Sequence, residues 1–165
     1  MPTSTFLKPF LIKSFLLMVL LVGFKFQLFS QEYSTDSHTV LLLHFNEPVG
    51  SSVSDASGNN NTGTATGTTI VNGRYGKARS FNGTSDFVSF LNGGVVPSSG
   101  DFTVECWVMT PVLDGSYREV LSQGGATTQA FYLGYAPTGK IRGGDIDDFN
   151  AYFPIGNWHH LAIVR

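Results

Sequence analysis

The sequence predicts an all-β fold, an antiparallel sandwich, and three observations support it. Apolar and polar residues alternate over short segments, most clearly between Phe102 and Thr110. Turn-forming pairs such as Asn72-Gly73 and Asn82-Gly83 separate these segments at intervals of roughly ten residues, which suits a sandwich. After the first thirty residues, no segment keeps the apolar period of a helix.

The first thirty residues predict a secretory signal peptide. Lys8 and Lys13 precede an apolar run over residues 15–24, and no acidic residue occurs before Glu32. A membrane-spanning helix needs ~20 apolar residues, and Lys25 ends this run early, so a permanent anchor is the weaker alternative. We expect cleavage after Ser30 and a chain that is secreted or held at the cell surface. The membrane is then a partner only transiently, through the signal peptide.

The charge distribution argues against nucleic acid as a partner. Three of the ten basic residues lie in residues 1–30, so seven remain against twelve acidic residues, a formal charge of −5. These seven are scattered along the sequence, whereas nucleic-acid binders carry a clustered basic surface. Cys106 is the only cysteine, so we expect no internal disulfide and a packed side chain, not a reactive thiol.

The elements follow in order along the chain. After a polar lead at residues 31–38, the apolar run 39–45 predicts a buried strand. Residues 50–69 are small and polar and predict an exposed loop. Further strands are predicted at residues 68–71, 78–81, 86–91, 102–110, 119–122, 129–135, 140–142 and 157–165.

Strand alternation also predicts which side chains face the core. From Phe102 to Val108, the even-numbered residues are apolar, and they share one face of the strand. Glu105 and Trp107 then share the opposite face. In the last predicted strand, His159 and His160 must point to opposite sides, so we expect one to pack beside the core and the other to meet solvent.

Two blocks of the sequence resemble the laminin G-like, concanavalin A-like jelly-roll domains. The first block joins a glycine-rich stretch at residues 73–88 to a Phe-Thr-x-x-x-Trp-Val strand at 102–108, and the second is the Asp-x-Ser-Gly-Asn loop at 55–63. The Trp-His-His-x-Ala strand at 158–162 is similar as well. The resemblance implies a jelly-roll over residues 39–165. It also implies further C-terminal strands, so we expect this domain to be cut short and to be part of a larger protein.

The resemblance further implies a function. Such domains are commonly non-catalytic recognition modules, so we expect an extracellular module that binds carbohydrate. A protein-binding adhesion or structural domain is the alternative, and a glycoside hydrolase of the same fold is a weaker one. We predict no catalytic residue, and the sequence assigns no ligand-binding residue.

Aromatic residues could provide a platform for a sugar, because flat rings stack on the apolar faces of pyranoses. Most of them should be structural, since Phe131, Leu133 and Tyr135 alternate as one strand face. The candidates are Trp107, Tyr132, Tyr135, Phe149 and Tyr152.

Calcium is the one ion that the sequence suggests. Asp55, Ser57, Asn59 and Asn61 offer oxygen ligands on a glycine-bearing turn. We favour the alternative that these side chains cap their own backbone, so we predict no metal and no cofactor.

Other polar groups have simpler interpretations. The acidic cluster of Asp145, Asp147 and Asp148 lacks the pattern of a calcium loop and is best explained as a solvated loop, not as paired catalytic carboxylates. His44 is isolated in the sequence. Asn60 and Asn82 begin glycosylation triplets, and Asp86 is a residue of the 73–88 block worth testing.

Overall fold

The computed structural model describes residues 32–90, 94–125, 128–144 and 149–165. The predicted signal peptide and the acidic cluster at 145–148 lie outside these residues. Within them the structure contains ten strands and no helix, so the all-β class is confirmed and no helix could cross a membrane.

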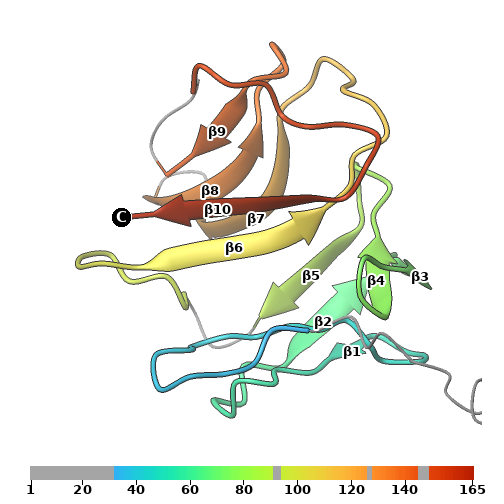
Figure 1. Cartoon of the computed structure of the whole chain (residues 1–165), viewed down its shortest axis with the longest axis vertical. Coiled ribbons are helices and arrows are strands. Elements are labelled where there is room, and N and C mark those ends of the chain that lie inside the picture. Colours follow the sequence, from blue (N-terminus) through green and yellow to red (C-terminus); the bar gives the residue numbers. More distant parts are fainter. Residues whose placement is uncertain (1–31, 91–93, 126–127, 145–148) are drawn as a thin grey trace, which may run out of the picture. The chain divides into compact units, whose positions relative to one another are not determined.

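The strands form four antiparallel groups (Figure 1). In the first, β2 (Gly63–Thr66) lies between β1 (Ser52–Val53) and β5 (Phe87–Phe90). The hairpin of β3 (Thr69–Asn72) and β4 (Lys77–Ser80) forms the second. β6 (Thr103–Val108) pairs with β10 (His159–Val164). The fourth has β8 (Thr128–Tyr135) between β7 (Arg118–Gly125) and β9 (Ile141–Gly143).

The core lies between the β6–β10 pair and the β7–β8–β9 sheet, which Figure 1 shows as separate groups of strands. Phe131 of β8 is 1% exposed, and Phe102 meets its ring edge-on at 5.5 Å between centroids. Val104 and Cys106 of β6 pack against this cluster, as the alternating pattern predicts. Burial raises the pKa of the Cys106 thiol to about 11, so the thiol stays protonated at neutral pH.

The predicted strand at residues 39–45 is wrong, because this segment pairs with no strand. Its backbone bonds to the following loop instead. The Leu42 amide donates to Asp55 Oδ1 at 3.1 Å, and the Asn61 side-chain amide donates to the Val40 carbonyl at 3.0 Å. Polar side chains thus take the place of a neighbouring strand.

The prediction that residues 50–69 form one exposed loop is also wrong in part, because β1 and β2 lie within it. Val53 is fully buried and pairs with Gly63. A Cβ at Gly63 would come within 2.7 Å of the Phe90 ring and 2.9 Å of Val88. The small residues that suggest a loop here are those that let strands approach closely.

Gly67, directly after β2, gives the first testable prediction. Its φ is 75°, and a Cβ there would run into the carboxylate of Asp86. We expect Gly67→Ala to lower the free energy of unfolding by about 1–2 kcal/mol through backbone strain and by about 1 kcal/mol more through the contact. Urea unfolding followed by tryptophan fluorescence measures the total loss in the free energy of unfolding.

Gly50→Ala is the matched control for Gly67→Ala. Gly50 has a φ of 89°, but a Cβ there would meet open space. It should therefore show the backbone strain alone, and equal losses for the two variants would contradict the role of Asp86.

Candidate functional site

The face of the β6–β10 pair that points away from the core carries the candidate site. Glu105 and Trp107 of β6 lie on this face, because the residues between them pack inward. His160 of β10 pairs in register with Trp107. His159 alternates with Leu161 and Ile163, which pack against the core, and it is partly buried, whereas His160 is exposed, as the strand period predicts.

Trp107 is the centre of a group of rings on this face. The His160 ring lies 5.4 Å from it between centroids, tilted by 46°. Tyr75 meets it edge-on at 5.6 Å. Such contacts fix the indole, which is partly buried.

The polar lead supplies Tyr33 to the same face. Its hydroxyl is hydrogen-bonded to His160 Nε2 at 2.7 Å, across 127 residues of sequence. The ring stays 44% exposed. Partial burial raises the pKa of Tyr33, the charges of Glu105 and Tyr75 raise it further, and a hydrogen bond from Trp107 opposes the rise.

Glu105 contacts the same imidazole nitrogen. Its Oε2 lies 3.2 Å from His160 Nε2, and both side chains are about a third exposed or more, at 41% and 34%. Nε2 can donate to Glu105 when protonated and accept from the Tyr33 hydroxyl when not. The imidazole therefore makes one of these two contacts in each state, with β6 through Glu105 or with the lead through Tyr33.

Arg74 lies against two of these rings. It stands with Tyr75 in the tight β3–β4 turn, which a bond from the Gly73 amide to the Gly76 carbonyl closes at 3.0 Å. Its guanidinium carbon lies 5.2 Å from the Tyr75 centroid and 5.5 Å from the Trp107 centroid. Arg74 itself is exposed. We name the whole group the outer-face cluster, comprising Tyr33, Arg74, Tyr75, Glu105, Trp107 and His160.

The outer-face cluster combines partly exposed aromatic rings with hydrogen-bonding side chains, of which some are acidic and some are basic. Rings offer flat apolar surface, and the carboxylate, imidazole, phenol and guanidinium offer donors and acceptors at its edge. This combination suits a ligand with apolar faces and many hydroxyl groups.

Of the ring candidates from the sequence, only Trp107 belongs to this cluster. Tyr132 and Tyr135 are each 5% exposed, so they pack in the fold and cannot serve as a platform. Tyr152 is 71% exposed, and its backbone bridges to Lys140 beside β9. Phe149 is partly buried.

The Asp55 loop has the capping role that we favoured over calcium binding. Oδ1 of Asp55 accepts from the Leu42 and Ser57 amides, at 3.1 and 2.9 Å. Oδ2 accepts from the Ser57 hydroxyl at 2.8 Å and from the backbone amide of Asn61 at 3.0 Å. Both oxygens are thus engaged by donors of the chain. No group of three or more His, Cys, Asp or Glu side chains in the described ranges could hold a metal ion.

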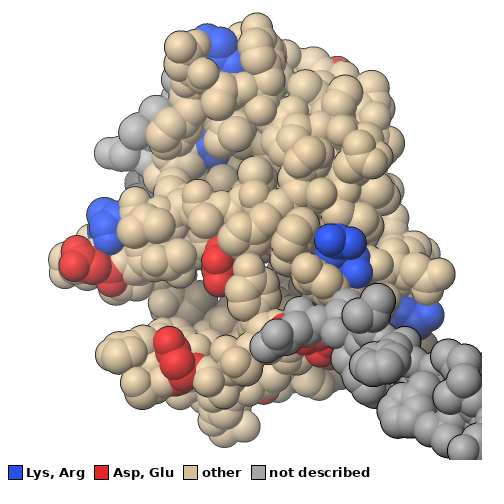
Figure 2. All heavy atoms as spheres, viewed as in Figure 1, with Lys and Arg blue, Asp and Glu red and all other residues tan. Residues whose placement is uncertain are grey.

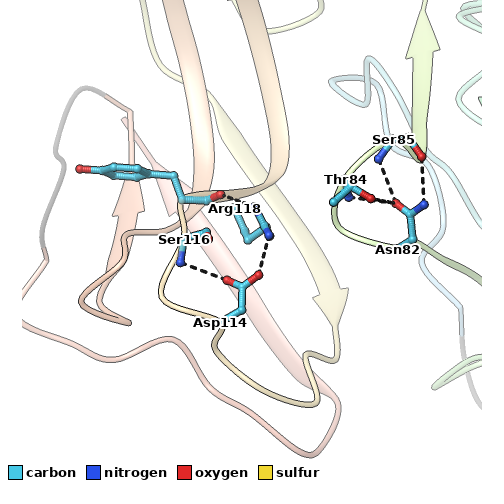
Figure 3. A network of polar contacts seen from close by, with 7 residues as sticks. Asn82, Thr84, Ser85, Asp114, Ser116 and Arg118 are labelled. Atoms are coloured by element: carbon cyan, nitrogen blue, oxygen red, sulfur yellow. Dashed lines mark hydrogen bonds and ion pairs between the residues drawn. The ribbon is translucent and has the colours of Figure 1, made fainter.

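The remaining polar candidates also bond within the chain. Asp86 Oδ2 accepts from the Asn82 amide at 2.9 Å, and Asn82 Oδ1 accepts from the Thr84 and Ser85 amides at 2.9 and 3.0 Å. Figure 3 shows this turn and, near it, the loop in which Asp114 pairs with Arg118 at 2.5 Å. These contacts order the turns.

Asn60 and His44 lie outside the outer-face cluster. Asn60 is exposed, with a φ of 60°. His44 lies 3.3 Å from Glu32, so it is not isolated in the fold.

Tyr33, Arg74 and Tyr75 were not singled out from the sequence. The alternation in β6 does indicate that Glu105 and Trp107 share one face of the strand. Nothing local indicates that the lead and the β3–β4 turn reach the same face, because these contacts are long-range.

Comparison with known proteins found no match: no family model, no curated protein and no solved structure is similar to the chain. The laminin G-like resemblance therefore rests on the sequence motifs and stays a prediction.

Proposed function

We propose that the chain is an extracellular, non-catalytic recognition module that binds carbohydrate through the outer-face cluster. The observation that carries the proposal is the gathering of three part-exposed rings, two acid–base groups and a guanidinium on one sheet face. Rings can stack on pyranose faces while the polar groups bond the hydroxyls. The rigid antiparallel pair beneath holds these groups in place.

The fold that we propose for residues 39–165 is a laminin G-like jelly-roll. Antiparallel pairing and the two sheets packed across Phe131 support this. A signal peptide at residues 1–30, an exported chain and a larger parent protein belong to the same proposal. The sequence motifs support it, and the cluster is chemically consistent with it.

The distribution of surface charge gives no support to nucleic acid as a partner. On the face shown in Figure 2, the basic residues lie at several separate places and do not gather in one patch. A nucleic-acid binder would need basic residues gathered in one patch.

A protein ligand is the second candidate, and one observation favours it. Val164 and Met109, at the two ends of the β6–β10 region, are 72% and 48% exposed. Exposed apolar residues beside aromatic ones are typical of protein interfaces. Glycoside hydrolysis has less support, because it needs two cooperating carboxyl groups. The outer-face cluster contains one carboxyl group, that of Glu105, which contacts the imidazole of His160.

Tyr33→Ala tests the proposed site. We expect the whole chain to be retarded in native gels that contain a suitable polysaccharide, and the variant to bind about tenfold more weakly, equivalent to about 1.4 kcal/mol. The variant loses an exposed ring and its hydrogen bond to His160. A panel of neutral and acidic plant, algal and bacterial polysaccharides serves as the ligand set.

Tyr152→Ala is the matched control, because it removes another exposed tyrosine ring outside the cluster. It should leave retardation unchanged. Loss of binding in Tyr152→Ala but not in Tyr33→Ala would refute the site. No retardation by any polysaccharide would refute the function and favour a protein ligand.

A further inference from the structure

We infer that the outer-face cluster takes an acidic saccharide and that Arg74 binds its carboxylate. This inference rests on the proposed function and adds the class of sugar. It depends on the position of one cation and on where the neighbouring acids are engaged.

Arg74 is exposed, and its charge is not neutralised within the described part of the chain. None of the ion pairs found there involves it. Two acids of this region are engaged elsewhere: Glu105 lies 3.2 Å from the His160 ring, and Glu32 lies 3.3 Å from the His44 ring. A cation without an anionic partner, beside the proposed sugar platform, is available to the anion of a ligand.

The geometry of Arg74 suits a carboxylate. Its guanidinium lies over Tyr75 and Trp107 at 5.2 and 5.5 Å. A guanidinium held over rings keeps the N–H groups at its edge available, and these match a carboxylate in a bidentate arrangement. The tight β3–β4 turn fixes the backbone of Arg74, which lowers the entropy lost on binding.

A sugar acid would use the whole cluster. Its carboxylate would bond Arg74 at the β3–β4 end, while its ring and hydroxyls would meet the aromatic and polar groups toward Tyr33. The net charge of the chain is negative, so it repels polyanions in general. Retardation of the chain by an acidic polymer would therefore indicate a local binding site and not a general attraction between charges.

The test compares polysaccharides that differ in the anion. Native gels of the whole chain would contain polygalacturonate, alginate, fully methyl-esterified polygalacturonate or a sulfated galactan. We expect retardation by a uronate polymer and at least tenfold weaker binding to the esterified form. Tighter binding to the sulfated galactan than to both uronates would overturn the carboxylate assignment.

Arg74→Lys and Lys77→Gln separate a specific contact from general charge. Arg74→Lys keeps the charge but loses the planar fork, and we expect about tenfold weaker binding to uronate. Lys77→Gln removes one charge from the same hairpin, where Lys77 bonds Asn72, and should bind as the unmodified chain does. Equal losses in both variants would overturn the inference.

The failure of this inference is distinguishable from failure of the proposed function. Binding to neutral polymers that depends on Tyr33 but not on Arg74 would leave the function intact and overturn the acidic ligand. Retardation by none of the polymers would overturn both.

Discussion

Phe131→Ala should lower the free energy of unfolding by about 3–5 kcal/mol, the usual cost of removing a buried phenylalanine. Phe131 is 1% exposed and stands at the centre of the packing between the two sheets. Phe102 would lose its edge-on contact with the ring, and the cavity would lie where β6 and β8 meet. Urea unfolding at neutral pH, followed by tryptophan fluorescence, gives the value.

Phe81→Ala is the control for Phe131→Ala, because it removes the same side chain from a site that is 48% exposed. It should cost less than about 1 kcal/mol, since little apolar surface is lost from the interior. If the two variants were equally stable, the core between the sheets would not hold the fold together.

The same core shows what could be predicted from the sequence. The alternation over Phe102–Val108 identifies the inward residues of β6, and turn signals place eight strands approximately, because both depend on neighbouring residues. The strand predicted from the apolar run 39–45 is wrong because its contacts depend on residues farther along the chain. Most of its partners are side chains from Asp55 to Asn61, with one backbone bond from Ala56 to Leu42, and no local pattern distinguishes such a segment from a strand.

The outer-face cluster has a similar limit. Trp107 could be named as a candidate ring, and the strand period sets Glu105 beside it. Tyr33 and Arg74 could not be assigned to it, since the contact between Tyr33 and His160 spans 127 residues. The pairing of β6 with β10 and the path of residues 32–38 bring these side chains together, and neither can be predicted from the local sequence.

Asp55→Asn should lower the free energy of unfolding by about 3–5 kcal/mol at neutral pH. The change keeps the shape of the side chain but puts an NH₂ group opposite N–H or O–H donors, so about two charge-assisted hydrogen bonds are lost. The loss should exceed that of Asp101→Asn, because Asp101 is exposed. Equal stability of the two variants would mean that the Asp55 loop does not organise residues 39–45.

Acid should remove this difference between the unmodified chain and Asp55→Asn. Burial of the Asp55 carboxylate raises its pKa, but hydrogen bonds from Leu42, Ser57 and Asn61 outweigh burial and the pKa lies below its ordinary value. A carboxyl with a lowered pKa in the folded state stabilises fully above its unfolded pKa of about 3.9, and this stabilisation fades as pH falls through the folded pKa. Unfolding curves between pH 7 and pH 2 should therefore converge for the two proteins at the acid end. A gap that stays constant over this range would show that the ionised carboxylate is not what holds the loop.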